Sequence, residues 1–215
     1  MRRSDFLGES ARAGVAATIR ALEATTRAEL VVAVRPRSAV YRETDYLVGL
    51  VFAQATLSAL LFLPQTFHIA SWPAEVLLGF VLGAFVSSSV WPLKRWLAPR
   101  GRLAREVRRA ARAAFFDLGV GRTRERTGIL VFVSVLERSV EVVLDVGAES
   151  VLEEVAWAEA RGALERAVRA QDLAGFTAAL GGLAAPLAAA LPRRPDDANE
   201  LPDELDLAKL FEGAP

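Results

Sequence analysis

The chain has 215 residues, among them no cysteine and a single histidine, His68. The lack of cysteine excludes disulfides, thiolate nucleophiles, zinc fingers and iron–sulfur ligation. A single histidine excludes multi-histidine metal sites and argues strongly against a Ser-His-Asp triad. Positive and negative charges are balanced, since Lys and Arg number 26 and Asp and Glu also number 26. We therefore expect no nucleic-acid partner.

Charged side chains are also missing from the stretch between Asp45 and Glu75. Two apolar runs, residues 46–67 and 71–93, are each long enough to cross the roughly 30 Å hydrocarbon core of a bilayer as a helix. The short connection between them contains His68, which we interpret as a loop residue. These runs predict an antiparallel transmembrane hairpin over residues 45–94; two buried helices of a soluble protein are the alternative.

Basic residues flank the predicted hairpin on both sides but are absent from its connecting loop. They are Arg35, Arg37, Arg42, Lys94, Arg95, Arg100 and Arg102. By the positive-inside rule, both termini and the folded domain are expected in the cytoplasm, with two spans in the cytoplasmic membrane and the lipid bilayer as a partner. The N-terminus has no apolar core, so a signal peptide is not expected.

The remaining segments indicate one α/β domain that the hairpin interrupts, formed by residues 1–44 and 95–192. A helix is predicted over 5–25 and strands over 29–34, 129–135 and 139–146, with a tight turn between the last two. An apolar stripe from Leu103 to Leu118 predicts a further helix, whose other face carries arginines. Ser150 and Glu153 match a capping box, which predicts a helix from 150 to about 170.

A last helix is expected through Leu173 and Leu187, kinked or shortened by Pro186. Residues 193–215 form an acidic tail that we expect to be extended or disordered. The first two strands are joined through a helix and should be parallel. The fold class is therefore α/β, a three-layer α/β/α sandwich with a small mixed sheet, interrupted by a two-helix transmembrane hairpin.

The first strand leads directly to the hairpin, so its carboxyl end should face the bilayer. The carboxyl edge of parallel strands is the usual ligand crevice of open α/β sheets. The residues expected there, as a site for an anion or a partner, are Arg37, Ser38, Tyr41, Glu137 and Arg138. The alternative is ordinary juxtamembrane charge that meets anionic lipid.

The opposite edge of the sheet collects a second set of candidates. Asp145 and Glu29 offer oxygen ligands for Ca²⁺ or Mg²⁺, the metals that this composition permits most easily. Arg122, Thr123 and Arg126 offer an anion site instead. A structural ion pair between Glu29 and Arg126 is the plainer interpretation. No cofactor is predicted with certainty.

Arginines also gather on one face of the helix that follows the hairpin. Arg105, Arg108, Arg109 and Arg112 can bind acidic lipid, form a solvated face, or dock the acidic tail. Each such arginine contributes about 1 kcal/mol near a charged membrane surface.

Several segments in this order resemble the membrane-anchored bacterial branch of the TPM domain family. The most specific are Arg122–Val142 and Asn199–Asp203, and the similarity runs over nearly the whole chain. The resemblance implies an α/β/α sandwich. Family members include acid phosphatases, calcium-binding proteins and factors that assemble or repair membrane complexes.

No recognisable catalytic constellation accompanies this architecture. We therefore expect a binding, assembly or quality-control factor with a membrane-protein partner, not an enzyme. Two alternatives stay open: a divalent-metal-dependent phosphatase, which only the family resemblance suggests, and a module that binds anionic lipid through its arginines.

Overall fold

The structure is a computed structural model that describes residues 8–63, 68–194, 200, 201 and 206, with the side chains of residues 91–93 left out. The chain divides into two compact units. Residues 1–38 and 104–215 form the first, which we call the sheet domain, and residues 39–103 form the second, the hairpin unit. The predicted amino-terminal residues 5–7 of the first helix lie outside the described residues.

The sheet domain is built on three strands, β1 (Glu29–Arg35), β2 (Gly128–Ser134) and β3 (Ser139–Leu144), in the order β1-β2-β3. β1 and β2 are parallel and pair Glu29 with Gly128 through Arg35 with Ser134. β3 is antiparallel to β2. The predicted α/β class with a small mixed sheet is confirmed.

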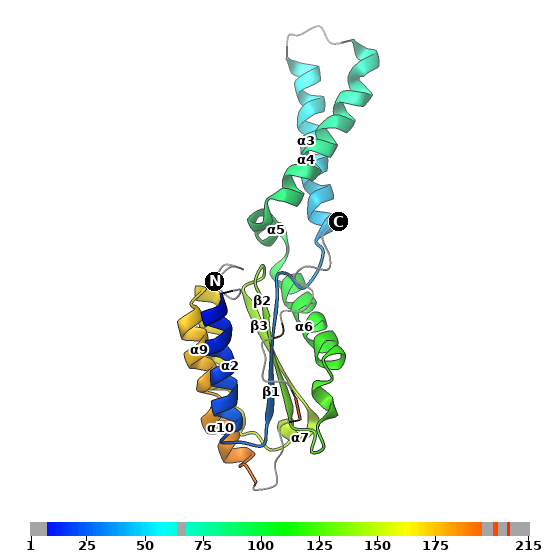
Figure 1. Ribbon diagram of the computed structural model, residues 1–215. Helices are drawn as coiled ribbons and strands as arrows, with labels where there is room; N and C mark the ends of the chain where they lie inside the picture. Colours follow the sequence, from blue (N-terminus) through cyan, green and yellow to red (C-terminus); the bar gives the residue numbers. More distant parts are fainter. Residues whose placement is uncertain (1–7, 64–67, 195–199, 202–205, 207–215) are drawn as a thin grey trace. The chain divides into compact units, whose positions relative to one another are not determined.

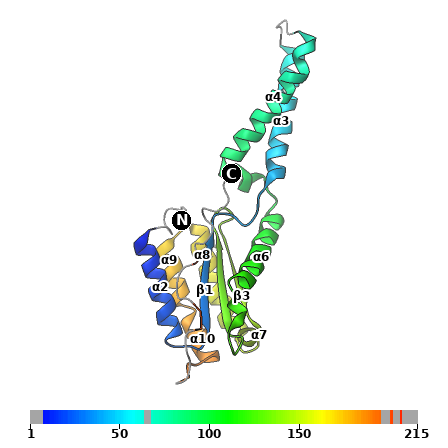
Figure 2. The ribbon, with the colours of Figure 1, turned by 45° about the vertical axis from the view of Figure 1, so that its right-hand side comes forward.

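Helices cover both faces of this sheet (Figures 1 and 2). On one face α2 (Glu9–Glu23), α8 (Glu154–Ala170), α9 (Leu173–Gly181) and α10 (Ala184–Ala190) enclose the larger core. On the other face α6 (Arg100–Asp117) forms a smaller core. Alternate residues of β1 serve the two cores, with Val32 in the larger one and Val31 in the smaller one, as the period of two in a strand requires.

Two predicted helices of the sheet domain are wrong in their bounds. The capping box at Ser150 is not used, because Ser150 ends a short α7 (Val146–Glu149) and its hydroxyl donates to the Gly147 carbonyl. α8 begins only at Glu154. The predicted last helix is two helices, and the helical structure is interrupted at Gly182 and Leu183, before Pro186.

The hairpin unit contains α3 (Arg42–Phe62), the 3₁₀ turn η1 (Ile69–Ser71), α4 (Trp72–Ser89) and α5 (Trp91–Leu97). α3 and α4 lie side by side and run in opposite directions (Figures 1 and 2). The second apolar run therefore ends earlier than predicted, at Ser89, and a separate helix follows. The predicted end of the first run, residues 64–67, lies outside the described residues.

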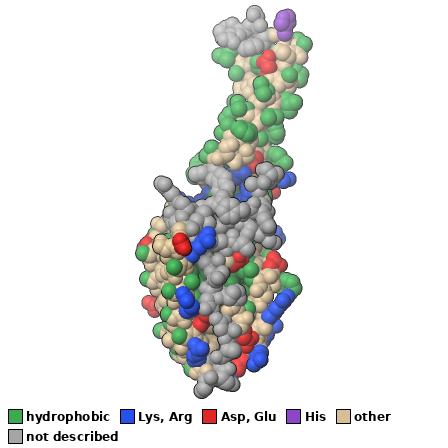
Figure 3. Space-filling model, viewed as in Figure 1, with side chains coloured by type: hydrophobic (Ala, Val, Ile, Leu, Met, Phe, Trp, Pro, Cys, Tyr) green, Lys and Arg blue, Asp and Glu red, His purple; other side chains and the backbone are tan. Residues whose placement is uncertain are grey.

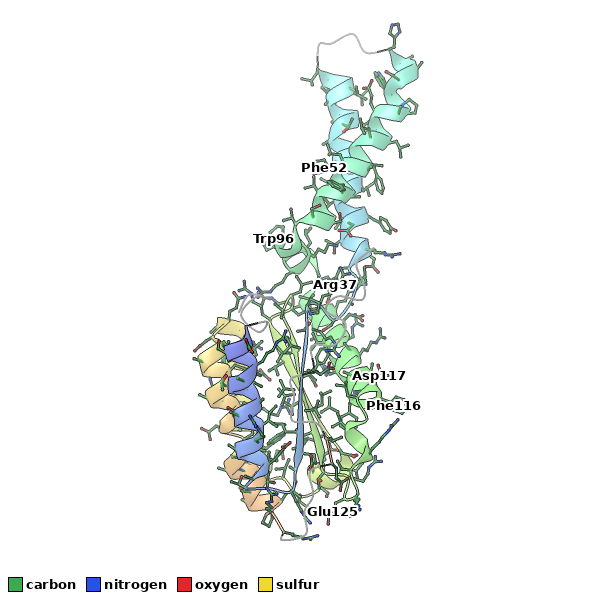
Figure 4. All side chains as sticks on the ribbon, in the orientation of Figure 1. Arg37, Phe52, Trp96, Phe116, Asp117 and Glu125 are labelled. Carbon is green, nitrogen blue, oxygen red and sulfur yellow. The ribbon has the colours of Figure 1, made fainter. Side chains whose placement is uncertain are left out.

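Glycines let α3 and α4 approach closely. A Cβ atom placed on Gly83 would lie 2.7 Å from the Cβ of Phe52, and one on Gly49 would lie 2.9 Å from the Phe80 carbonyl oxygen. The Phe52 side chain is drawn on α3 in Figure 4. Small residues at such positions are typical of packed helices in membranes.

Three helical segments in the described part of the chain are long and apolar enough to cross a membrane: 42–62, 69–89 and 173–190. The first two expose large apolar side chains, including Leu50, Phe62 and Phe85. The third is α9 with α10, and its largest apolar side chains face the core of the sheet domain, with Phe176 and Leu187 fully buried.

The outer edge of β1 is covered by a piece of the acidic tail. The Asp206 N–H donates to the Val32 carbonyl (2.9 Å), and its carbonyl accepts from the Val34 N–H (3.1 Å). The Asp206 carboxylate lies 2.8 Å from Arg35. This part of the predicted extended tail is thus ordered against the sheet; residues 195–199, 202–205 and 207–215 lie outside the described residues.

Candidate functional site

The carboxyl edge of β1 and β2 holds a hydrogen-bonded group of three side chains. Ser38 donates from its hydroxyl to the Ser134 hydroxyl (2.8 Å), which donates to Glu137 (2.5 Å). The other carboxylate oxygen of Glu137 accepts from the Ser38 N–H (3.0 Å). Ser134 and Glu137 are buried, and the group ties the end of β1 to the β2–β3 turn.

The other candidates expected at this edge come from different segments. Arg37, which is labelled in Figure 4, is half-buried and directly precedes Ser38 in the sequence. Tyr41 belongs to the hairpin unit, where it is the N-cap residue of α3. Arg138 has a left-handed backbone (φ 50°) in the β2–β3 turn and lines a cavity described below. Ser38 and Glu137 are thus two members of the predicted set that the structure joins by a hydrogen bond.

At the opposite edge, Asp145 acts as a structural residue. Its carboxylate accepts from the Val146 N–H (2.8 Å), which caps α7, and lies 2.9 Å from the Nε atom of Arg126. Only 3% of Asp145 is exposed. The Asp145 carboxylate is therefore engaged by the backbone of α7 and by Arg126.

Glu29, the second predicted metal ligand, accepts from two backbone N–H groups of the tail, those of Glu200 and Leu201 (3.3 Å each). The expected ion pair between Glu29 and Arg126 is wrong, because Arg126 pairs with Asp145 instead. Thr123 is buried and accepts from the Thr127 N–H, whereas Arg122 is exposed. No group of three or more Asp, Glu or His side chains able to hold a metal occurs in the described part of the chain.

A polar cavity of the sheet domain lies elsewhere, along the outer edge of β3. It has a volume of about 360 Å³, within the range of ligand sites. We call it the arginine cavity; its lining comprises Ala104, Arg108, Arg138, Ser139, Val140, Glu141, Arg161, Glu165 and Arg169. α6 and α8 cover opposite faces of the sheet, and their arginines meet at this edge.

Positive charge exceeds negative charge in this cavity, with four arginines against two glutamates. Arg169 pairs with Glu165 on the same helix at 3.5 Å. Among the described residues, no carboxylate oxygen lies within 4.0 Å of the guanidinium groups of Arg108, Arg138 or Arg161. Three cations around one hollow are an arrangement that attracts an anion.

Burial raises the pKa of the Glu141 carboxyl, which sits on β3 between the two helices. Arg108, Arg161 and Arg112 oppose that rise in pKa, and Glu165 adds to it. The arginines thus surround Glu141 without cancelling the cost of its burial. A nearby anion would have to approach this carboxyl group, so its protonation state matters for binding.

The sequence interpretation missed most of the arginine cavity. It singled out Arg138 and noted Arg108, but not Glu141, Arg161, Glu165 or Arg169. A signal was present, because residues 161, 165 and 169 are spaced by four and so share one face of a helix. The spacing does not predict, however, that β3 lies beside that face of the helix.

No protein family and no curated protein matches the chain. Among solved structures, it is similar to the BA42 protein of the psychrophilic bacterium Bizionia argentinensis, determined by NMR. The two are 16% identical, the alignment covers 95% of this chain and 97% of that chain, and the TM-score is 0.58. At this identity the likeness concerns the fold alone.

Proposed function

We propose that the chain is a membrane-anchored binding protein, in which α3 and α4 cross the bilayer and the sheet domain carries the binding surface. The observation that carries the proposal is the surface of α3 and α4. Large apolar side chains are exposed along both helices, whereas charged side chains gather over the sheet domain (Figure 3). Water is a poor solvent for such a surface, and lipid is a good one.

Hydrogen bonds of the hairpin unit support the same proposal. The hydroxyls of Ser88 and Ser89, on the exposed surface of α4, both donate to the Phe85 carbonyl and so need no partner outside the helix. Asp45 is held by Ser87 and Lys94 at the end of the hairpin where charges begin. Trp96 is 81% exposed beside these charges, as an aromatic side chain in a bilayer interface would be.

Two spans, not three, follow from where the apolar side chains point. In 173–190 the exposed positions are small residues such as Ala174, Ala178 and Ala185. The leucines at 180, 183 and 187 are buried. With two spans and basic residues on both flanks, both termini and the sheet domain would lie in the cytoplasm.

A binding role accounts for the sheet domain better than catalysis does. The resemblance to the TPM domain family suggests phosphatase activity as well as assembly of membrane complexes. However, such an enzyme would need the carboxylates of Asp145 and Glu29 to bind its metal. In the structure Asp145 pairs with Arg126 and caps α7, and Glu29 accepts a hydrogen bond from the tail. We therefore propose a role in the assembly or quality control of a membrane-protein partner.

Single cysteines test the anchoring directly, because the chain has none. His68→Cys places the label between α3 and α4, and Ser150→Cys places it on the exposed end of α7 as the matched control. In intact cells, a membrane-impermeant maleimide should label only His68→Cys, and Ser150→Cys should react after permeabilisation. Equal labelling of both variants, or release of the chain by alkaline carbonate, would contradict the proposal.

Phosphatase activity provides the test of the binding role. The full chain in detergent, with Ca²⁺ or Mg²⁺, should not hydrolyse a phosphomonoester. Metal-dependent turnover that is lost in Asp145→Asn would overturn the binding role and favour the enzyme. Asn can still cap α7, so this variant separates a metal role from folding.

A further inference from the structure

Three guanidinium groups from three different segments converge on the arginine cavity. Arg108 comes from α6, Arg138 from the β2–β3 turn and Arg161 from α8. We propose that the arginine cavity binds a phosphoryl group, through these three side chains. The inference deepens the proposed binding role, since it names the ligand chemistry of the sheet domain.

The first step is that the cavity must take an anion. Like charges brought together on a folded protein repel each other, and the usual remedy is a carboxylate within reach. Glu165 lies 3.5 Å from Arg169, but no described carboxylate lies that close to Arg108, Arg138 or Arg161. A bound anion removes this repulsion and satisfies the guanidinium donors.

The second step is the kind of anion. A single carboxylate is matched by one guanidinium in a bidentate pair, so three guanidiniums exceed what it can accept. A phosphoryl group carries up to two charges and three terminal oxygens, and accepts from several arginines at once. The three cationic side chains in the cavity thus match a phosphoryl dianion in number and in charge.

The third step concerns the two carboxyl groups in the cavity. Glu165 is engaged by Arg169 on the same helix. Glu141 faces Arg108 and Arg112 from α6 and Arg161 and Glu165 from α8. Burial raises the pKa of this carboxyl group, and the negative charge of a bound anion would act in the same direction, so a bound phosphoryl group and a charged Glu141 oppose each other.

The fourth step is size and access. The volume of about 360 Å³ far exceeds the roughly 30 Å³ that one water occupies, so a phosphoryl group and part of the molecule that carries it can enter. The side chain of Arg169 is 74% exposed, so the cavity opens to solvent. The group can come from a free phosphate compound or from a phospholipid whose headgroup ends in a phosphomonoester, which share the same chemistry.

Calorimetric titration of the full chain in a neutral detergent tests the proposal, with inorganic pyrophosphate as the probe. Arg108→Gln and Arg161→Gln should each weaken binding about tenfold, the loss expected when one charge-assisted pair is removed. The matched controls are Arg109→Gln on α6 and Arg166→Gln on α8. Both arginines are exposed and outside the cavity lining, and these variants should bind within about twofold of the unchanged chain.

Two further probes identify the source of the phosphoryl group. Short-chain phosphatidic acid, whose headgroup is a phosphomonoester, would assign the cavity to a lipid headgroup if it binds more tightly than pyrophosphate, and the reverse order would assign it to a soluble phosphate compound. Either result supports the proposal, provided that Arg161→Gln weakens the binding. Succinate, a dicarboxylate with two negative charges, should bind at least about tenfold more weakly than pyrophosphate.

The proposal is overturned by any of three results: no pyrophosphate binding by the folded chain, equal losses in the control variants, or succinate binding as tight as that of pyrophosphate. Near-UV circular dichroism establishes that each variant is folded. These outcomes are separate from those of the cysteine labelling, because the arginine cavity lies wholly within the sheet domain. Failed anchoring leaves phosphoryl binding intact, and failed binding leaves the membrane topology intact.

Discussion

Asp45 and Lys94 form an ion pair of 2.9 Å between the first turn of α3 and α5. The second oxygen of the Asp45 carboxylate accepts from the hydroxyl of Ser87 on α4 at 2.8 Å. One carboxylate therefore connects three helices of the hairpin unit. Both members of the pair are largely buried, with side chains 14% and 8% exposed. Removing one partner should thus leave an uncompensated charge behind.

Asp45→Asn is expected to destabilise the hairpin unit by about 3 kcal/mol, because Lys94 loses its counter-charge while it stays buried. The double variant Asp45→Leu/Lys94→Met should recover much of that loss, since it removes both charges. Denaturant unfolding in detergent, followed by tryptophan fluorescence, measures the difference. A double variant as unstable as Asp45→Asn alone would refute the role of charge compensation.

The chain offers a matched control for this experiment. Glu43 and Arg102 also form an ion pair, of 2.7 Å, but their side chains are 61% and 34% exposed. Exposed pairs contribute little, so Glu43→Gln should change the unfolding free energy by less than about 1 kcal/mol.

The contact between α3 and α4 at Gly83 makes a second prediction. A Cβ atom there would meet the Cβ of Phe52 at 2.7 Å and the Val48 carbonyl oxygen at 2.9 Å. Gly83→Ala should therefore destabilise the unit by about 1–3 kcal/mol through overpacking. Gly101→Ala on α6 is the control, because nothing lies within 4 Å of its Cβ, and it should stabilise by about 0.5–1 kcal/mol. Thermal unfolding in detergent compares them, and a more stable Gly83→Ala would disprove the close approach.

The sheet could be predicted because its signals are local. Leu30–Val34 is apolar throughout, which is typical of a strand covered on both faces, and the helix between it and the next strand requires a parallel pair. The observed β1 and β2 agree with both points. The bounds of α7 and α8 could not be predicted, because Asp145, one residue after β3, is the N-cap of α7. The capping box expected at Ser150 indicated a single, later helix instead.

The arginine cavity could not be predicted, because it depends on tertiary placement. Arg108 and Arg161 are more than fifty positions apart, and only the stacking of α6 and α8 on opposite faces of the sheet brings both to β3. The docking of Asp206 on β1 is similar. Composition marks the tail as acidic, but the free edge of β1 and the charge of Arg35 decide where it binds.

Asp206→Ala tests that docking. Without the 2.8 Å pair to Arg35, the tail should leave β1 more often, so the Val34 amide, which donates to the Asp206 carbonyl, should exchange about fivefold to tenfold faster. Amides of β2, which pair within the sheet on both sides, provide the internal control and should exchange at unchanged rates. Hydrogen exchange read by NMR measures both. An unchanged Val34 rate would mean that the ion pair does not hold the tail in place.

The stability of the sheet domain should depend on pH through Glu141. Burial raises the pKa of this carboxyl in the folded chain, and Arg108, Arg161 and Arg112 only partly oppose the rise. A raised folded-state pKa means that folding favours the protonated form. Its contribution to stability is therefore complete below the unfolded pKa, about 4.3, and is lost as the pH rises through the folded-state pKa.

Glu141→Gln should consequently be more stable than the unchanged chain at neutral pH, because the neutral amide does not carry the cost of a buried charge. The advantage should disappear at about pH 3.5, where the carboxyl group is protonated in both states. Glu159→Gln, an exposed position on the same α8 that carries Arg161, is the control and should show little difference at either pH. The unfolding free energies of the unchanged chain and of both variants, measured across this pH range, test the prediction. If Glu141→Gln is instead less stable at neutral pH, attraction by the surrounding arginines outweighs burial, and Glu141 serves to hold the cavity together.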